Sequence, residues 1–375
     1  MHSAALTHDN QILTWGVNDE GTLGRDTKDK TKKTPIDAAS DTDGDETEDD
    51  EMEFNLKEAS PLPVDPSHFP RGTIFTHLVA TDSATFVLTR EGLVYGWGTF
   101  RGNNGRIGFS PKIDIQSTPV LVPGLQNVTK LAAGAQHILA LTSDGVHQTS
   151  SSDDLPWLTP GKCALRDIID TGAGLYHSFA IQKNGKVYGW GSNNFGQTGV
   201  FDGAGQSGAM VLYLTEVPSF RKRVIEKDVK ITSVFGGKNH SLALTNQGKC
   251  LTWGRIDNKD LGFATAEIPP SDIIHDAYGK PRILKAPKSI SLRDIAFTTA
   301  GTDHSFGITN DGKTYSWGFN DQHQAGHDAD EDDGDDKGEI EEPTLLDSKY
   351  VKGKRLVLTA AGGQFSIVAG LSDSN

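Results

Sequence analysis

Short apolar segments alternate with short polar turns along most of the chain. In one representative stretch, "HSFAI" from His177 is followed by the turn "QKNG" and then by "KVYGW" from Lys186. Two such runs around an Asn-Gly pair predict a β-hairpin with a two-residue turn. The triplets "REG", "SDG", "NQG" and "NDG" take the same place in other copies. The pattern therefore predicts an all-β protein.

The hairpins belong to a longer unit that recurs at a nearly constant spacing. Its Trp-Gly pairs begin at positions 15, 97, 190, 253 and 317, and the last two steps are 63 and 64 residues. A unit of this length with four short strands is typical of a β-propeller, whose blades bury their faces against their neighbours. Seven starts of the unit are present, and they predict seven blades in a single β-propeller domain over residues 1–375. The starts lie at Met1, Thr81, Gly134, Leu175, Lys238, Thr302 and Gly362.

Two units depart from the repeat. The chain opens in the middle of a unit, and after "GAQHILALTSDG" the expected Trp-Gly motif does not follow. About half a blade is therefore expected to be missing at the N-terminus, and another blade to be interrupted near 147–165. Either the protein is a divergent homologue or the chain is an incomplete version of a longer gene product. A propeller protects its strand edges by closing its ring, and the loss of two half-blades would expose such edges, which favours the second alternative.

Charge is unevenly distributed along the chain. The formal net charge is −14, but the segment 41–53 holds nine acidic residues and the segment 328–342 holds ten. Outside these segments, 35 basic residues stand against 31 acidic ones. Runs of like charge repel and bury little apolar surface, so we expect both segments to be solvated loop insertions. A dedicated histone-binding role is the alternative.

Several classes of protein are disfavoured by what the sequence lacks. It has no apolar run of the length of a membrane helix and no secretory signal at Met1, so we expect a soluble intracellular protein without a membrane partner. Cys163 and Cys250 lie far apart without a C-x-x-C motif, which predicts reduced thiols. No nucleophile elbow, zinc-protease motif or P-loop occurs, so we expect no covalent catalysis and no cofactor.

Histidines recur at one position of the repeat. Five of the 12 histidines occupy this position, and a single imidazole per blade is expected to bond a neighbouring turn rather than to bind a metal. These five residues are His2, His137, His177, His240 and His304.

Three stretches carry a family resemblance: "WGVNDEGTLGRDT" from Trp15, "WGTFRGNNGRIG" from Trp97 and "VYGWGSNNFGQTG" from Val187. They resemble the regulator of chromosome condensation family, the seven-bladed propellers that act as guanine-nucleotide exchange factors for the small nuclear GTPase Ran. The resemblance implies a nuclear protein with Ran as its partner. Chromatin (histones or DNA) is a second implied partner, weakened because the family's basic segments are missing. The alternative is a non-catalytic propeller scaffold that binds a GTPase or chromatin.

The resemblance also implies a GTPase-binding surface. Asp82 in "TDSATF" matches an aspartate of that surface, and Asn194 in "GSNNFGQ" matches a polar contact residue. Gln136 and Asn239 stand where the family has an aspartate and a histidine. For Asp82 and Asn194 the alternative is ordinary turn chemistry, in which the side chain bonds its own backbone.

One copy of the repeat is longer than the others. From Trp to the closing Gly four copies run ten residues, whereas the copy at Trp97 takes 12. The resemblance identifies this loop as the wedge that presses into the GTPase beside the nucleotide. Phe100 and Ile107 are expected to anchor its arms and Arg101 and Arg106 to project charge, and a neutral loop insertion is the alternative. The expected wedge comprises Phe100, Arg101, Gly102, Asn103, Asn104, Gly105, Arg106 and Ile107.

Overall fold

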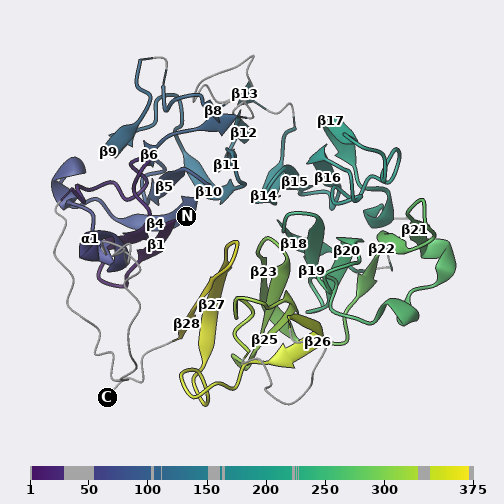
Figure 1. Cartoon of the computed structure of the whole chain (residues 1–375). Coiled ribbons are helices and arrows are strands. Elements are labelled where there is room, and N and C mark those ends of the chain that lie inside the picture. The colour runs from purple at the N-terminus through teal and green to yellow at the C-terminus, as the bar shows by residue number, and fades with distance from the viewer. Residues whose placement is uncertain are drawn as a thin grey trace, which may run out of the picture. The chain divides into compact units, whose positions relative to one another are not determined.

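The computed structural model describes residues 2–28, 55–102, 105–110, 112–150, 161–162, 165–221, 224, 226, 228–327 and 338–370. They fall into two compact units, which are described separately. The first unit comprises Met1–Val128 and Thr149–Pro160, and the second comprises Thr129–Gln148 and Gly161–Asn375. Strands dominate both units, as the alternation of apolar segments and turns predicted (Figure 1). Among the described residues, no helix is long and apolar enough to cross a membrane.

The first unit contains two blade-like antiparallel sheets and one small hairpin. The strand orders are β1-β2-β3, β4-β5-β6-β9 and β7-β8. The strands are β1 (His2–Leu6), β2 (Ile12–Gly16), β3 (Leu62–Pro63), β4 (Phe75–Ala80), β5 (Ala84–Thr89), β6 (Val94–Gly98), β7 (Arg101–Gly102), β8 (Gly105–Arg106) and β9 (Gln116–Leu121). The helical turn α1 (Leu56–Ala59) lies between β2 and β3 in the chain, and the 3-10 turn η1 (Pro66–His68) follows β3.

The second unit contains four larger sheets and a terminal hairpin. Their orders are β10-β11-β12-β13, β14-β15-β16-β17, β18-β19-β20-β22-β21, β23-β24-β25-β26 and β27-β28. The first two sheets are built from β10 (Val128–Ala133), β11 (His137–Thr142), β12 (Gly145–Ser150), β13 (Gly161–Lys162), β14 (Ile168–Ala173), β15 (His177–Gln182), β16 (Val187–Ser192) and β17 (Met210–Glu216). The others are built from β18 (Ile231–Gly236), β19 (His240–Thr245), β20 (Cys250–Arg255), β21 (Ile273–His275), β22 (Pro281–Ser289), β23 (Ile295–Ala300), β24 (His304–Thr309), β25 (Thr314–Phe319), β26 (Glu339–Leu345), β27 (Leu356–Ala361) and β28 (Ser366–Gly370).

The number of blades differs from the seven expected. The described residues form six sheets of three to five strands that follow the repeat, and the seventh start of the unit yields only the pair β27-β28. The sheet expected to be interrupted near 147–165 is four-stranded, because His147 and Gln148 of β12 pair with Lys162 and Gly161 of β13. Its last strand is only two residues long, which is why the sequence pattern failed to show it.

The acidic segments are only partly within the described residues. Residues 41–53 and 328–337 lie outside them. The end of the second segment was wrongly assigned to a loop, since Glu339–Leu345 forms β26 and pairs with β25. An outer strand of a blade tolerates Glu339, Glu341 and Glu342 because much of such a strand is accessible to solvent.

The hairpin turns at Gln182 and Thr245 contain one residue more than predicted, whereas only Ser143 and Asp144 separate β11 from β12. In the Gln182 hairpin, the Gln182 N–H donates to the Lys186 carbonyl at 2.8 Å, so three residues lie between this closing pair. Gly185 adopts a left-handed φ of 89°, which a type I turn followed by a glycine bulge requires. The corresponding bond from Thr245 to Lys249 is 2.9 Å long. The Asn-Gly signal identified the hairpin correctly but did not distinguish these two loop lengths.

Side chains of adjacent sheets join into shared cores. One core combines Phe179 and Val187 of the β14–β17 sheet with Val234 and Trp253 of the next sheet. The middle strands are buried on both faces, and every residue of β5, β11, β19 and β24 is buried. Each blade therefore depends on its neighbour for burial, as a repeat architecture requires.

The recurring histidines connect neighbouring sheets. The expectation that each of these imidazoles bonds a neighbouring unit is confirmed. The partner, however, is a hydroxyl group on a strand rather than a turn. His177 Nε2 lies 2.7 Å from Ser241 Oγ, and His240 Nε2 lies 2.9 Å from Ser305 Oγ. The remaining pairs are His2 with Thr85, His137 with Ser178 and His304 with Ser366.

Candidate GTPase-binding site

The 12-residue copy of the repeat forms a small hairpin in the first unit. Arg101 pairs with Arg106, and Gly102 pairs with Gly105, in strands β7 and β8. Gly105 has a φ of 116°, and a Cβ added there would meet open space. Asn103 and Asn104, expected at the tip, lie outside the described residues. The hairpin has only two ladder pairs, so its orientation depends on contacts outside it.

Aromatic packing anchors the base of the hairpin. Phe100 is only 6% exposed, and its ring lies 5.9 Å from Phe86 and 6.4 Å from Phe109, centroid to centroid. The Ile107 N–H donates to the Phe100 carbonyl at 2.9 Å. Phe100 thus anchors one arm as predicted, while Ile107 is half-buried. Phe109 is a third anchor, which sequence reasoning missed.

The closing glycine of the 12-residue copy has a different neighbour from those of most ten-residue copies. In three of the four ten-residue copies, the closing Gly lies against the Trp of the next blade: a Cβ on Gly24 would come within 2.8 Å of Trp97 Nε1, and one on Gly262 within 2.9 Å of Trp317 Nε1. In the fourth copy, Gly326 faces Leu346 instead. Gly108 instead faces the Ile113 carbonyl and Asp114. The unit that follows lacks a Trp-Gly motif, so Gly108 has no tryptophan against it.

The two arginines of the hairpin are held by a glutamate from the preceding sheet. Glu20 Oε1 lies 3.3 Å from Arg101 Nη1, and Glu20 Oε2 lies 2.8 Å from Arg106 Nε. Both arginine side chains remain 51% and 41% exposed and share one carboxylate, so each is paired while still facing solvent. Glu20 was not selected from the sequence, since no local pattern relates it to residues 81 and 86 positions away.

Asp82 lies in the turn between β4 and β5, in the same unit as the hairpin. Its side chain is exposed, yet the surrounding protein atoms raise the pKa of its carboxyl by desolvation, and the nearby Arg101 partly opposes that rise. The turn itself is held by Thr81, whose Oγ1 accepts the Ala84 N–H at 2.9 Å and the Ser83 N–H at 3.3 Å. Because Thr81 supplies this turn chemistry, the Asp82 carboxylate is available for a partner.

The other three predicted contact residues lie in the second unit and are half-buried. Gln136 directly precedes His137, and Asn239 directly precedes His240, so both occupy one position of the repeat. The side-chain oxygen of Asn194 is buried without a hydrogen-bond partner among the described residues. An unpaired buried amide oxygen costs stability, which sets Asn194 apart from an ordinary turn residue.

Asp303 is a further acidic residue at the repeat position of Gln136 and Asn239. It directly precedes His304, its carbonyl accepts the Phe319 N–H at 2.7 Å, and its Oδ1 is buried without a partner among the described residues. The fixed offset from the recurring histidine was the sequence signal that could have identified it.

A carboxylate, an imidazole and a hydroxyl form a chain in the core of the second unit. Asp260 Oδ2 lies 3.5 Å from His240 Nδ1, and His240 Nε2 lies 2.9 Å from Ser305 Oγ. This order of groups is that of a hydrolase triad, but all three residues are 0% exposed. Burial raises the pKa of Asp260 well above its usual value and lowers that of His240 to about 3. No substrate reaches these groups, so their role is structural.

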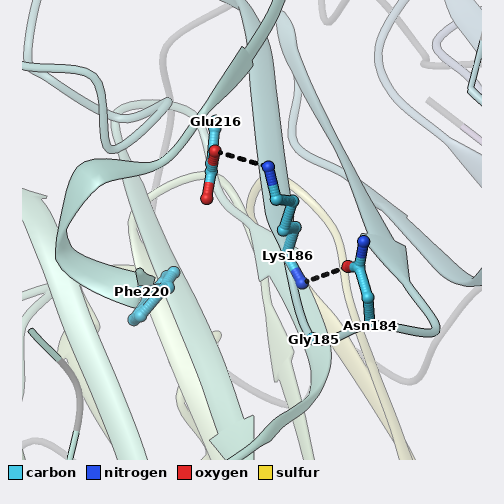
Figure 2. A pocket seen from close by; sticks show the side chains of 5 residues that line it. All are labelled: Asn184, Gly185, Lys186, Glu216 and Phe220. Carbon is cyan, nitrogen blue, oxygen red and sulfur yellow. Dashed lines mark hydrogen bonds and ion pairs between the residues drawn. The ribbon is translucent and has the colours of Figure 1, made fainter. Parts of the chain in front are cut away.

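A surface hollow of about 210 Å³ lies beside the hairpin turn of β15 and β16 (Figure 2). It is lined by Asn184, Gly185, Lys186, Glu216 and Phe220. Lys186 Nζ binds Glu216 Oε2 at 3.1 Å, and the Asn184 side-chain oxygen accepts the Lys186 N–H at 3.0 Å. The charges in this hollow already neutralise each other, and nothing in it indicates a ligand. Within the described ranges, no group of three or more His, Cys, Asp or Glu residues is arranged to hold a metal ion.

Comparison with known proteins identifies the family. The model of the RCC1-like domain matches residues 1–368 of the chain. The protein belongs to the RCC1-like domain family. Its sheets are accordingly the blades of an RCC1-type β-propeller. The family match covers nearly the whole chain, including both units.

Two curated yeast proteins are similar to this RCC1-like chain over its full length. Protein pim1 of Schizosaccharomyces pombe is 34% identical over 391 residues, which cover 100% of the chain and 67% of pim1. The guanine nucleotide exchange factor SRM1 of Saccharomyces cerevisiae is 32% identical over 396 residues, which cover 100% of the chain and 78% of SRM1.

A solved structure shows the same fold. Prp20p of Saccharomyces cerevisiae matches with a TM-score of 0.84 and 30% identity, over 100% of this RCC1-like chain and 81% of Prp20p. Its crystal structure was described together with its binding to Gsp1p and histones.

Proposed function

We propose that this protein is a guanine-nucleotide exchange factor for the small GTPase Ran. The observation that carries the proposal is the β7-β8 hairpin, rooted on the buried Phe100 and placed beside the exposed Asp82. It is the copy of the repeat that takes 12 rather than ten residues from Trp to the closing Gly. The names of SRM1, an exchange factor, and of Prp20p, which binds Gsp1p, support this function.

Exchange needs binding energy rather than bond making. A small GTPase holds its nucleotide through backbone amides of a phosphate-binding loop and through Mg²⁺ on the phosphates. A partner that binds the nucleotide-free form more tightly than the loaded form shifts the equilibrium towards release. The hairpin is the element that would intrude beside the phosphates, while polar residues around it dock the GTPase. No nucleophile or general base is required.

The docking surface of our proposal comprises Asp82 together with Gln136, Asn194 and Asn239. Asp82 would contribute a negative charge for a basic side chain of the GTPase, and the three amides would contribute hydrogen bonds. Phe100 to Ile107 would form the wedge, including Asn103 and Asn104 at its tip.

The cellular role follows from the same family membership. We propose that the chain works as a single propeller domain with seven blades, and that it acts in the nucleus. Relatives carry the name regulator of chromosome condensation, and Prp20p binds histones. Histones are therefore a second proposed partner.

Release of fluorescently labelled GDP from Ran tests the proposal. We expect substoichiometric protein to accelerate release, deletion of residues 103–105 to abolish the acceleration, and Asp82→Ala to weaken it by about tenfold, the effect of losing one central interface contact. The deletion should leave the circular dichroism spectrum and the unfolding midpoint unchanged, since Phe100 and its packing remain. Binding of nucleotide-free Ran without any acceleration by the intact protein would instead identify a non-catalytic scaffold.

A further inference from the structure

The carboxylate of Glu20 touches both arms of the β7-β8 hairpin. It accepts Arg101 with one oxygen, at 3.3 Å, and Arg106 with the other, at 2.8 Å. The Glu20 side chain is 16% exposed, whereas those of Arg101 and Arg106 are 51% and 41% exposed. The glutamate is thus the more enclosed member of both ion pairs and is shared between them.

Without Glu20 the hairpin would carry an unfavourable charge arrangement. Arg101 and Arg106 stand directly opposite each other in the β7-β8 ladder, and like charges in such a pair repel. The ladder has only one other residue pair, Gly102 with Gly105. Neither glycine contributes a side chain that would offset the repulsion. A carboxylate between the two guanidinium groups therefore removes the main obstacle to closing the hairpin.

The loop that carries Glu20 is firmly attached to the next blade. The carbonyl of Thr22 accepts hydrogen bonds from Trp97 Nε1, at 2.8 Å, and from Thr85 Oγ1, at 3.0 Å. Thr22 is 3% exposed and Leu23 is 0% exposed. Because these anchors lie within three residues of Glu20, its backbone is held in place by core packing.

Other charged groups near the hairpin act on the same two arginines. Arg101 lowers the pKa of Asp82 against the desolvation that raises it. Glu20, by its hydrogen bond and charge, and Asp114, by its charge, raise the pKa of Arg106. Of these three acids, Glu20 is the one that forms ion pairs with both arms in the described part of the chain, so it can restrain the hairpin as a whole.

We propose that Glu20 is a positioning residue that holds the hairpin in the orientation needed for nucleotide exchange. The proposal rests on the exchange function proposed above, but it concerns a residue that does not itself need to touch the GTPase. Glu20 acts by neutralising the Arg101–Arg106 pair and fixing it to the loop of the preceding blade. Its loss leaves the hairpin present but poorly oriented.

The test compares Glu20→Gln with Asp19→Asn, which removes the same charge from an exposed neighbour in the same loop. In the GDP-release assay with Ran, we expect Glu20→Gln to lower the maximal exchange rate about five- to tenfold. This is the effect expected from losing two partly exposed ion pairs and leaving the repulsion between Arg101 and Arg106 without compensation. The Ran concentration at half-maximal rate should stay unchanged. Asp19→Asn should behave as the unmodified protein in both respects.

Hydrogen exchange of the free protein gives a readout that does not depend on Ran. The amides of residues 101–108 should exchange faster in Glu20→Gln than in Asp19→Asn, while those of β5 and β6 remain equally protected. The unmodified protein could fail to accelerate GDP release while the difference in hydrogen exchange between the two variants persisted. The exchange function would then be wrong, and the restraint of the hairpin by Glu20 would be correct. Equal protection in both variants would overturn the positioning role, as would weaker Ran binding at an unchanged maximal rate.

Discussion

At the scale of single residues, His177 shows why the recurring histidines are neutral. Its ring is 0% exposed, Nε2 bonds Ser241, and the ring occupies the space where a Cβ on Gly174 would stand. Burial lowers the pKa of His177 from 6.5 to about 3, with a smaller contribution from neighbouring His240 and His137. A glycine at position 174 is therefore a steric requirement of the histidine.

The depressed pKa predicts the pH dependence of stability. In the unfolded chain His177 takes up a proton near pH 6.5, whereas in the folded protein it does so only near pH 3. Its contribution to stability is thus fully present above pH 6.5 and is lost as the pH falls towards 3, because the unfolded state then binds more protons. The same direction holds for His2, His137, His240 and His304.

We expect His177→Gln to make stability less sensitive to acid. Between about pH 6 and 5, the free energy of unfolding should fall with pH less steeply in the variant than in the unmodified protein. The two slopes should differ by about 1.4 kcal/mol per pH unit, which corresponds to the one proton that His177 takes up on unfolding. Urea unfolding at several pH values measures this slope. Identical slopes for the variant and the unmodified protein would mean that His177 is protonated in the folded state.

Residue-scale roles could be predicted only where they follow the repeat. The bridging histidines were recognisable because they recur at one offset, and Asp303 was open to the same reasoning. Glu20 was not, because an ion pair between residues 81 and 86 positions apart depends on how two loops approach in space. Asp82 and the wedge were selected by resemblance, and their role in exchange remains a prediction.

At the scale of elements, the interval between Trp and the closing Gly has a packing origin. The Trp317 indole donates to the Asp260 carbonyl at 2.9 Å and lies against Gly262, whose φ is 76°. Trp253 donates in the same way to the Gln197 carbonyl of the blade before it. The loops that close at Gly199 and Gly262 thus present a carbonyl and a glycine to the next blade, and both run ten residues.

Substituting such a glycine should be costly for two separable reasons. Gly262→Ala introduces a Cβ at positive φ and places it within 2.9 Å of Trp317. Gly279→Ala has a similar φ of 78° but meets open space. We expect a loss of about 3 kcal/mol for the first and about 1 kcal/mol for the second, measured by urea unfolding at pH 7.5. Comparable losses would show that backbone strain alone accounts for the glycine.

At the scale of the whole molecule, the proposed activity has no preferred direction. The protein contributes binding energy and forms no bond, so it lowers the barrier equally for release and uptake of a nucleotide. The direction of net exchange must come from the relative concentrations of GTP and GDP.

We therefore expect the protein to change the rate but not the outcome of exchange. With Ran in a fixed mixture of GDP and GTP, a trace amount of protein should shorten the time to equilibrium and leave the final ratio of bound nucleotides unchanged. Filter binding with the two nucleotides carrying different isotopes measures this ratio. A shifted final ratio at trace concentration would contradict the behaviour of a simple exchange factor.

The sequence by itself determined the fold class, the repeat, the hairpins and the bridging histidines, because these follow from local periodicity and recur at fixed offsets. It misjudged the sheet containing β12 and β13 and the end of the second acidic segment, since the two-residue β13 and the acidic β26 are defined by their pairing rather than by their composition. Only the tertiary structure decided that Gly108 faces the Ile113 carbonyl and that Glu20 joins Arg101 to Arg106. Such contacts depend on how distant segments meet, which no local pattern encodes.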